Sequence, residues 1–150
     1  MTTKTLTRDE VRAIEWDCQH ALARFLQALD GRDGRTAAAQ FAPDGRWERS
    51  RGAGSFEGRA AIAENIDTRP KNEASRHCMS NFVLDVKDAD HAESRCYLTV
   101  FRNDATGPEP VKFPIKMQLP AGVLLYCDKW VRTPEGWRIA EQWSERIFTR

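Results

Sequence analysis

Residues 76–86 combine the pattern of a β-strand with side chains that can do chemistry. The first half of this segment carries arginine, histidine, serine and asparagine, where a strand of a plain core would carry valine and isoleucine. Side chains alternate across a strand, so His77, Met79 and Asn81 are expected on one face. If that face lines a cavity, it offers an imidazole that titrates near neutral pH, with an amide beside it. If it faces water, both are ordinary surface residues.

The elements that would position this strand begin with helices. Thr7 and Glu10 make a capping box, and apolar residues at helical spacing then predict one long helix over residues 8–30, ended by Gly31. Two shorter helices are expected over 36–41 and 59–67. Between them we expect a turn at 43–45, a short strand over 46–49 and a glycine-containing loop over 50–57.

The second half of the chain has the pattern of long strands. Aromatic and β-branched residues predict strands over 76–86, 92–102, 122–132 and 137–147. A proline-rich excursion over 103–121 separates the middle two, with an edge strand expected at 112–118. Three helices followed by an antiparallel meander indicate a single α+β domain over residues 1–150, with the helices on one face of a curved, mostly antiparallel sheet.

The composition of the chain limits its expected partners and its expected location. The formal charge is +1 and no apolar run reaches the length of a membrane span, so neither nucleic acid nor membrane is an expected partner. The four cysteines lie far apart in apolar segments, which favours buried free thiols over a disulfide pair. The polar N-terminus lacks the apolar core of a signal peptide, so we expect the protein in the cytoplasm.

Several short motifs occur in a characteristic order: Leu-Asp-Gly-Arg-Asp at 29–33, Phe-Ala-Pro-Asp-Gly-Arg-Trp at 41–47, Phe-Glu-Gly-Arg-Ala-Ala-Ile at 56–62, Ser-Arg-His-Cys-Met-Ser-Asn at 75–81 and Gly-Trp-Arg-Ile at 136–139. In this order they resemble the SnoaL-like branch of the nuclear transport factor 2-like superfamily. That branch is similar to scytalone dehydratase, polyketide cyclases and the small subunits of aromatic-ring dioxygenases. The resemblance implies a cone-shaped α+β barrel with a deep pocket between the long helix and the concave face of the sheet.

The resemblance also implies a site. In the dehydratase-like members, an aspartate at the end of the first helix and a histidine on the mid-chain strand form an acid-base pair, and Asp30 and His77 match these positions. A second catalytic histidine would fall near Phe101, and a tyrosine at or near Arg49; both differ in this chain. The alternative is that Asp30 merely ends a helix and His77 fills a half-buried position.

Other residues are candidates for substrate binding. Aromatic side chains can wall an apolar pocket, or instead fill the sheet core or a dimer face: Trp47, Tyr97, Phe101, Tyr126, Trp130 and Trp143. Arginines suited to a carboxylate or phenolate, unless simply solvated, are Arg49, Arg76 and Arg146. Asn81 is the amide partner of His77. The histidines lack metal-ligand spacing, and no dinucleotide, phosphate-loop or nucleophile-elbow motif occurs, so we expect neither metal nor cofactor.

Two classes of function follow. The first is a cofactor-free acid-base enzyme, a dehydratase, isomerase or cyclase, acting on a small apolar or aromatic carbonyl compound. The second is a non-catalytic ligand-binding protein, or an assembly module like the dioxygenase small subunits. The long strands bear Tyr126, Trp130, Trp137 and Trp143, more aromatic surface than one concave face readily absorbs. We therefore expect a homodimer through the sheet.

Overall fold

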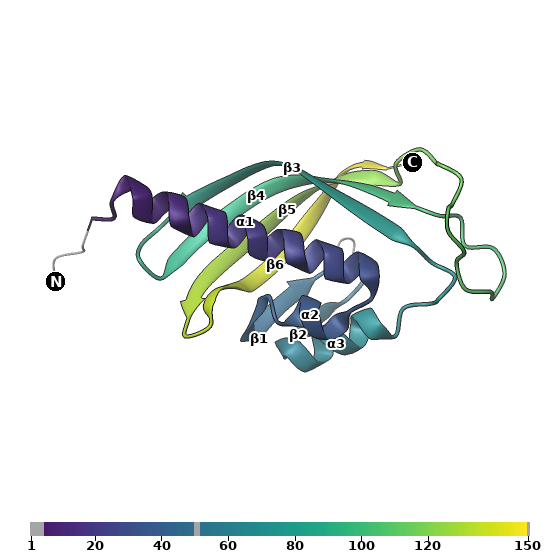
Figure 1. Ribbon diagram of the computed structural model, residues 1–150, viewed down its shortest axis with the longest axis horizontal. Coiled ribbons are helices and arrows are strands. Elements are labelled where there is room, and N and C mark those ends of the chain that lie inside the picture. Colours follow the sequence, from purple (N-terminus) through teal and green to yellow (C-terminus); the bar gives the residue numbers. More distant parts are fainter. Residues whose placement is uncertain (1–4, 50–51, 150) are drawn as a thin grey trace.

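The computed structural model describes residues 5–49 and 52–149, and there three helices pack against a six-stranded sheet (Figure 1). The helices are α1 (Arg8–Gly31), α2 (Gly34–Ala38) and α3 (Gly58–Asp67). The strands are β1 (Phe41–Glu48), β2 (Ser55–Glu57), β3 (Ser75–Val86), β4 (His91–Arg102), β5 (Gly122–Thr133) and β6 (Gly136–Thr149). Their order is β2-β1-β6-β5-β4-β3, with β1 and β6 parallel and all other neighbours antiparallel. The predicted α+β class and mostly antiparallel sheet are confirmed.

Helix α1 lies across one face of the sheet, which we call the inner face (Figure 1). The predicted capping box is present: the Glu10 backbone N–H donates to the Thr7 hydroxyl at 3.2 Å, and the Thr7 backbone N–H donates to the Glu10 carboxylate at 2.7 Å. Residues three and four apart form the buried stripe that faces the sheet: Ile14, Cys18, Ala21, Leu22, Phe25, Leu26, Ala28 and Leu29. Local capping and apolar periodicity therefore explain this helix.

The end of α1 differs from the prediction. Gly31 remains helical, and Arg32 takes the left-handed conformation at φ 60° and ψ 32°. That conformation costs a non-glycine residue roughly 1–2 kcal/mol. The Arg32 guanidinium offsets the cost by donating to three main-chain oxygens, those of Arg69 at 2.6 Å, Pro70 and Glu73. These bonds fasten the connection between α3 and β3 to the end of α1.

Several predicted boundaries in the first half are wrong. The predicted turn at 43–45 lies within β1, which starts at Phe41 and accommodates the irregular residues through a register shift against β6. The second helix spans Gly34–Ala38 instead of 36–41 because Asp33 caps it by accepting from the Thr36 N–H at 2.9 Å. Part of the predicted loop over 50–57 forms β2; residues 50 and 51 of that loop lie outside the described residues.

The excursion between β4 and β5 contains no strand, so the edge strand predicted at 112–118 is wrong. Proline removes hydrogen-bond donors along this segment, which projects beyond the end of the sheet (green in Figure 1). It is tied to the fold at its middle, where the Val111 N–H donates to the Lys71 carbonyl at 3.0 Å.

In β3, side chains stop alternating between the two faces of the sheet at a point where the sequence predicted the alternation to continue. His77 and Met79 point to the inner side, but the pairing with β4 shifts register between Ser80 and Val83, and Asn81 has φ 53°. This bulge leaves Asn81 exposed. The predicted common face of His77 and Asn81 is therefore wrong, because one extra residue inverts the phase of the strand.

Three of the four aromatic residues expected to need a dimer are instead buried within the chain. Tyr126, Trp130 and Trp137 are only 5%, 1% and 5% exposed, so the inner face and its edge absorb them; Trp143 alone stays half-buried. The aromatic argument for a homodimer thus loses most of its basis. The homodimer remains a prediction, which a measured mass by light scattering decides.

The cysteines are all free thiols, as expected. Cys18, Cys96 and Cys127 are buried, but Cys78 is exposed because it lies on the outer side of β3, so its predicted burial is wrong. Among the described helices, none is both long and apolar enough to cross a membrane.

Gly34 provides a test of the packing between α2 and α3. Its N–H donates to the Asp67 carboxylate at 2.8 Å, and a Cβ added here would lie 2.5 Å from the same carboxylate oxygen and closer still to the Ala63 carbonyl. Gly34→Ala should therefore lower the free energy of unfolding by about 1–3 kcal/mol, measured by urea denaturation. Gly31→Ala is the matched control, because no atom lies within 4 Å of its added Cβ. Equal stability of the two variants would contradict this packing.

Candidate active site

The structure brings Asp30 and His77 into direct contact. Asp30 lies in the last turn of α1 and His77 is the third residue of β3, and the His77 Nδ1 lies 2.6 Å from the Asp30 Oδ1. The His77 backbone N–H donates to the other carboxylate oxygen at 2.8 Å, and the Ser75 hydroxyl donates to Oδ1 at 3.0 Å. The Asp30 carboxylate therefore joins the end of the helix to the start of the strand.

These contacts fix the orientation of the imidazole. The side chains of His77 and Asp30 are only 6% and 10% exposed, so water competes little for their hydrogen bond. An ionised carboxylate can only accept, so Nδ1 is the donor and the proton of the neutral imidazole lies on Nδ1. Nε2 then carries a lone pair, and among the described residues it makes no hydrogen bond. Such a nitrogen can accept a proton.

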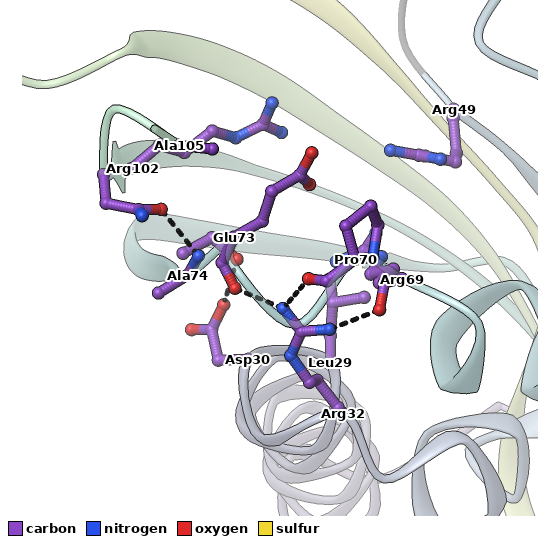
Figure 2. Close-up of a pocket in the computed structure, with 12 residues that line it drawn as sticks. Leu29, Asp30, Arg32, Arg49, Arg69, Pro70, Glu73, Ala74, Arg102 and Ala105 are labelled. Atoms are coloured by element: carbon purple, nitrogen blue, oxygen red, sulfur yellow. Dashed lines mark hydrogen bonds between the residues drawn. The ribbon is translucent and has the colours of Figure 1, made fainter. Parts of the chain in front are cut away.

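A cavity of about 470 Å³ opens beside this pair (Figure 2). Its wall combines the end of α1, the connection between α3 and β3, and the ends of β1 and β4: Leu29, Asp30, Arg32, Arg49, Arg69, Pro70, Glu73, Ala74, Ser75, Arg102, Asn103 and Ala105. Asp30 and Ser75 thus line the cavity, whereas His77 lies directly behind them and is not part of the wall. The volume suits a small organic molecule.

The cavity is strongly cationic. Burial, and after it the charges of the neighbouring Arg49 and Arg102, lower the pKa of Arg69 to about 10. Burial, followed by the charge of Arg102, likewise lowers the pKa of Arg49. The guanidinium groups of Arg49 and Arg69 stay charged at neutral pH, so like charges face one another in a partly desolvated space.

The predicted substrate-binding residues divide into two groups. Arg49 lines the cavity, and Trp47 lies directly behind it, because the guanidinium groups of Arg49 and Arg69 each sit 5.9 Å from the Trp47 ring centroid. Tyr126 is buried close enough to these arginines to affect the pKa of both. These residues surround one site.

The remaining predicted residues lie elsewhere. Asn81 is exposed at the bulge, and Trp143 is on the outer face of the sheet, where Lys129 lies 5.9 Å from its ring centroid. Phe101 lines a separate apolar hollow of about 740 Å³ together with residues of the excursion. Neither Arg76 nor Arg146 is part of the cavity wall. Strand alternation explains these placements, because Phe101 and Trp143 point to the side opposite the inner face.

Sequence reasoning missed Arg69, Arg102 and Glu73 of the cavity wall. Arg102 pairs with Ser75 in the β3–β4 register, so a correct hairpin register would have placed it beside the site. Arg69 and Glu73 belong to the irregular connection that the Arg32 side chain holds, and no periodic signal marks such a position.

A second buried carboxylate, Asp128, lies in the core. It is 1% exposed, and it accepts from the Ser94 hydroxyl at 2.9 Å and from the Gln142 amide at 2.6 Å. The Trp130 indole in turn donates to the Ser94 hydroxyl at 2.8 Å. Burial raises the pKa of Asp128 to about 6. This network is not part of the cavity wall, and its neutral partners assign it a structural role.

Residues 5–49 and 52–149 contain no group of three or more histidine, cysteine, aspartate or glutamate side chains placed to hold a metal ion. In the cavity the charged groups are mainly arginines, which suit anions and do not ligate cations.

Comparison with protein families finds a match over residues 10–142 to the model of the SnoaL-like domain. Among solved structures, an NTF2-like protein with a cystatin-like fold from Novosphingobium aromaticivorans is 23% identical with a TM-score of 0.73, over 93% of this chain and 86% of that one. A hexachlorocyclohexane dehydrochlorinase, LinA-type3, from Novosphingobium barchaimii LL02 is 16% identical with a TM-score of 0.78, over 95% and 93%. A protein of unknown function from Mycobacterium tuberculosis is 24% identical with a TM-score of 0.73, over 95% and 78%. A comparison with curated proteins found no match.

The pKa of Asp128 predicts a pH dependence of stability. Its folded value of about 6 exceeds the ordinary value of 3.8, so the folded state binds this proton more tightly than the unfolded state does. The contribution to stability is complete below about pH 4 and is lost as the pH rises through about 6, by roughly 3 kcal/mol. Asp128→Asn should remove this loss, because the amide stays neutral and the Ser94 hydroxyl can rotate to accept from it.

Urea denaturation of parent and variant across this pH range measures the effect. The difference between their free energies of unfolding should change with pH in favour of the variant. Asp85→Asn, which alters a carboxylate whose side chain is 54% exposed, is the control and should show no such trend. Parallel curves for the parent and Asp128→Asn would refute the assignment.

Proposed function

The chain belongs to the SnoaL-like domain family, and on this premise we propose that it is a cofactor-free acid-base enzyme, a lyase, isomerase or cyclase, acting on a small apolar or aromatic carbonyl compound. The observation that carries the proposal is the 2.6 Å contact between Asp30 and His77 at the edge of the 470 Å³ cavity. A titratable group with an orienting carboxylate beside a cavity is the usual arrangement of a general base.

The proposed reaction is a proton transfer. With Nδ1 donating to Asp30, the His77 Nε2 accepts a proton from a carbon adjacent to the substrate carbonyl. The imidazolium that forms is stabilised by the neighbouring carboxylate, which the Ser75 hydroxyl and the His77 backbone N–H hold in place. Returning the proton to another carbon gives isomerisation, and returning it to a departing hydroxyl gives dehydration. Asp30 is thus a positioning residue and His77 the base.

The structural neighbours support this proposal only in part. One of them is named a dehydrochlorinase, which is an elimination activity, but its identity of 16% relates the folds and not the reactions. The second catalytic histidine that the resemblance implies near Phe101 is missing in this chain, and Phe101 itself lies on the side of the sheet opposite the pair. The proposal therefore rests on one base, and not on a complete dehydratase site.

A second candidate is a non-catalytic ligand-binding protein or assembly module. It is favoured by the low exposure of the His77 side chain, 6%, and by its position behind the cavity wall. For catalysis, the substrate must reach Nε2 of His77, whereas a binding protein needs only the cavity. Catalytic contacts that are loose in the empty site can tighten when substrate binds. An experiment on the bound state therefore distinguishes the two candidates.

The test is proton exchange at carbon. The protein is incubated in D₂O with a panel of small aromatic and aliphatic ketones, and loss of the α-proton signals is followed by NMR. We expect the parent protein to accelerate exchange for at least one compound, and His77→Gln to reduce the rate by about 10²–10⁴-fold, because glutamine cannot accept the proton.

His91→Gln is the matched control. His91 also pairs with a carboxylate, Asp88 at 3.0 Å, but in an exposed turn away from the cavity. This variant should keep the parent rate. Exchange that survives unchanged in His77→Gln would eliminate the catalytic proposal, and absence of exchange in the parent would favour the binding protein.

A further inference from the structure

Three arginines from separate elements converge on the cavity. Arg49 follows β1, Arg69 follows α3 and Arg102 ends β4, and all three line the wall. Figure 2 shows Arg49 and Arg102 extending into the space from opposite sides above the end of α1. The ends of two strands and one helix thus direct guanidinium groups at a common volume.

No ion pair within the described part of the chain neutralises these guanidinium groups, although the Glu73 carboxylate acts to raise the pKa of Arg49. In the described part of the chain, none of the three takes part in an ion pair, and the Arg69 Nε is buried without a hydrogen-bond partner. Arg32, on the same wall, contrasts with them because three main-chain oxygens occupy its guanidinium. The carboxylate of Asp30 is likewise engaged by Ser75 and His77. A buried donor without a hydrogen-bond partner costs free energy, so this wall favours a bound acceptor that the chain itself does not supply.

Glu73 is the remaining acidic residue of the wall. Its carboxylate also extends into the cavity in Figure 2, but it forms no ion pair within 4.0 Å of the arginines of the described chain. Four arginines therefore stand against two carboxylates, one of which Ser75 and His77 already hold. The cavity keeps a net positive charge that one monoanion would reduce.

We propose that this cavity binds the carboxylate of a small organic acid, with Arg49, Arg69 and Arg102 as its binding residues. The planar fork of arginine matches the two oxygens of a carboxylate, and hydrogen bonds between charged groups are the stronger ones. The Trp47 ring backs two of the guanidinium groups and holds them in place. The apolar residues of the wall, Leu29 and Pro70 among them, can contact the body of the ligand.

This proposal specifies the substrate of the proposed function. Carboxylate binding itself does not depend on that function, and only the reaction of the bound compound does. The proposal restricts the substrate to a carbonyl compound that also carries a carboxylate. Binding and catalysis thus depend on different residues, so each can be tested separately.

The test measures binding of benzoate by isothermal titration calorimetry, with benzamide as the neutral analogue of the same shape and phenyl phosphate as the alternative anion. We expect benzoate to bind at least about tenfold more tightly than benzamide, the loss expected when a charged hydrogen bond is removed. Arg69→Gln and Arg102→Gln should each weaken benzoate binding by about tenfold and leave benzamide unchanged. Arg102 is exposed, so its variant is expected to fold even if Arg69→Gln does not.

Two controls separate this proposal from the proposed function. Arg95→Gln alters an arginine with a 61% exposed side chain on the same strand as Arg102 and should keep parent affinity for benzoate. His77→Gln should also keep it within about twofold, since the imidazole is not part of the wall. Equal binding of benzoate and benzamide, tighter binding of phenyl phosphate than of benzoate, or parent affinity in Arg102→Gln would each overturn the carboxylate assignment. Absence of proton exchange in the parent protein, with benzoate binding intact, would instead end only the catalytic proposal.

Discussion

The Asp30 carboxylate is the junction on which the site depends. Three hydrogen bonds from Ser75 and His77 converge on it, and they join the last turn of α1 to the first residues of β3 across 45 and 47 positions of sequence. Hydrogen bonds to a charged group are worth about 1.5–3 kcal/mol each where burial protects them, so this junction is a substantial part of a marginal total. Because α1 ends beside the start of β3, the same contact that joins the two elements also orients the imidazole.

The arginines around the cavity destabilise the fold, whereas the Asp30 junction stabilises it. The Arg32 guanidinium fastens the α3–β3 connection against the end of α1 and thereby brings Arg69 to the cavity. Arg69 forms a group of like charges with Arg49 and the exposed Arg102, and the partial burial of Arg49 and Arg69 makes this group destabilising in the empty structure. Structures that retain such a cost commonly do so at a functional site. In the function that we propose, the cationic wall holds a ligand and the Asp30–His77 pair moves its proton.

The sequence allowed the fold to be predicted where the signal was local or periodic. The Thr7–Glu10 capping box and the apolar stripe determine α1, and alternation determines the four long strands. The predictions failed where tertiary contacts override local preference: Asn81 lies in a bulge that inverts the strand phase, and Arg32 ends the helix in place of Gly31 because its side chain finds three carbonyl partners. For the site, the resemblance supplied Asp30 and His77, but Arg69 and Arg102 reach the cavity through an irregular connection and a hairpin register that no local pattern encodes.

The central claim is that Asp30 holds His77 with its proton on Nδ1 and a free lone pair on Nε2. Nitrogen-15 NMR of the histidine side chains above neutral pH measures this directly, and His91→Gln and His77→Gln assign the signals. We predict a protonated Nδ1 and an unprotonated Nε2 for His77, with the preference lost in Asp30→Asn. A His77 imidazole that carries its proton on Nε2, or a tautomer indifferent to Asp30→Asn, would contradict the account.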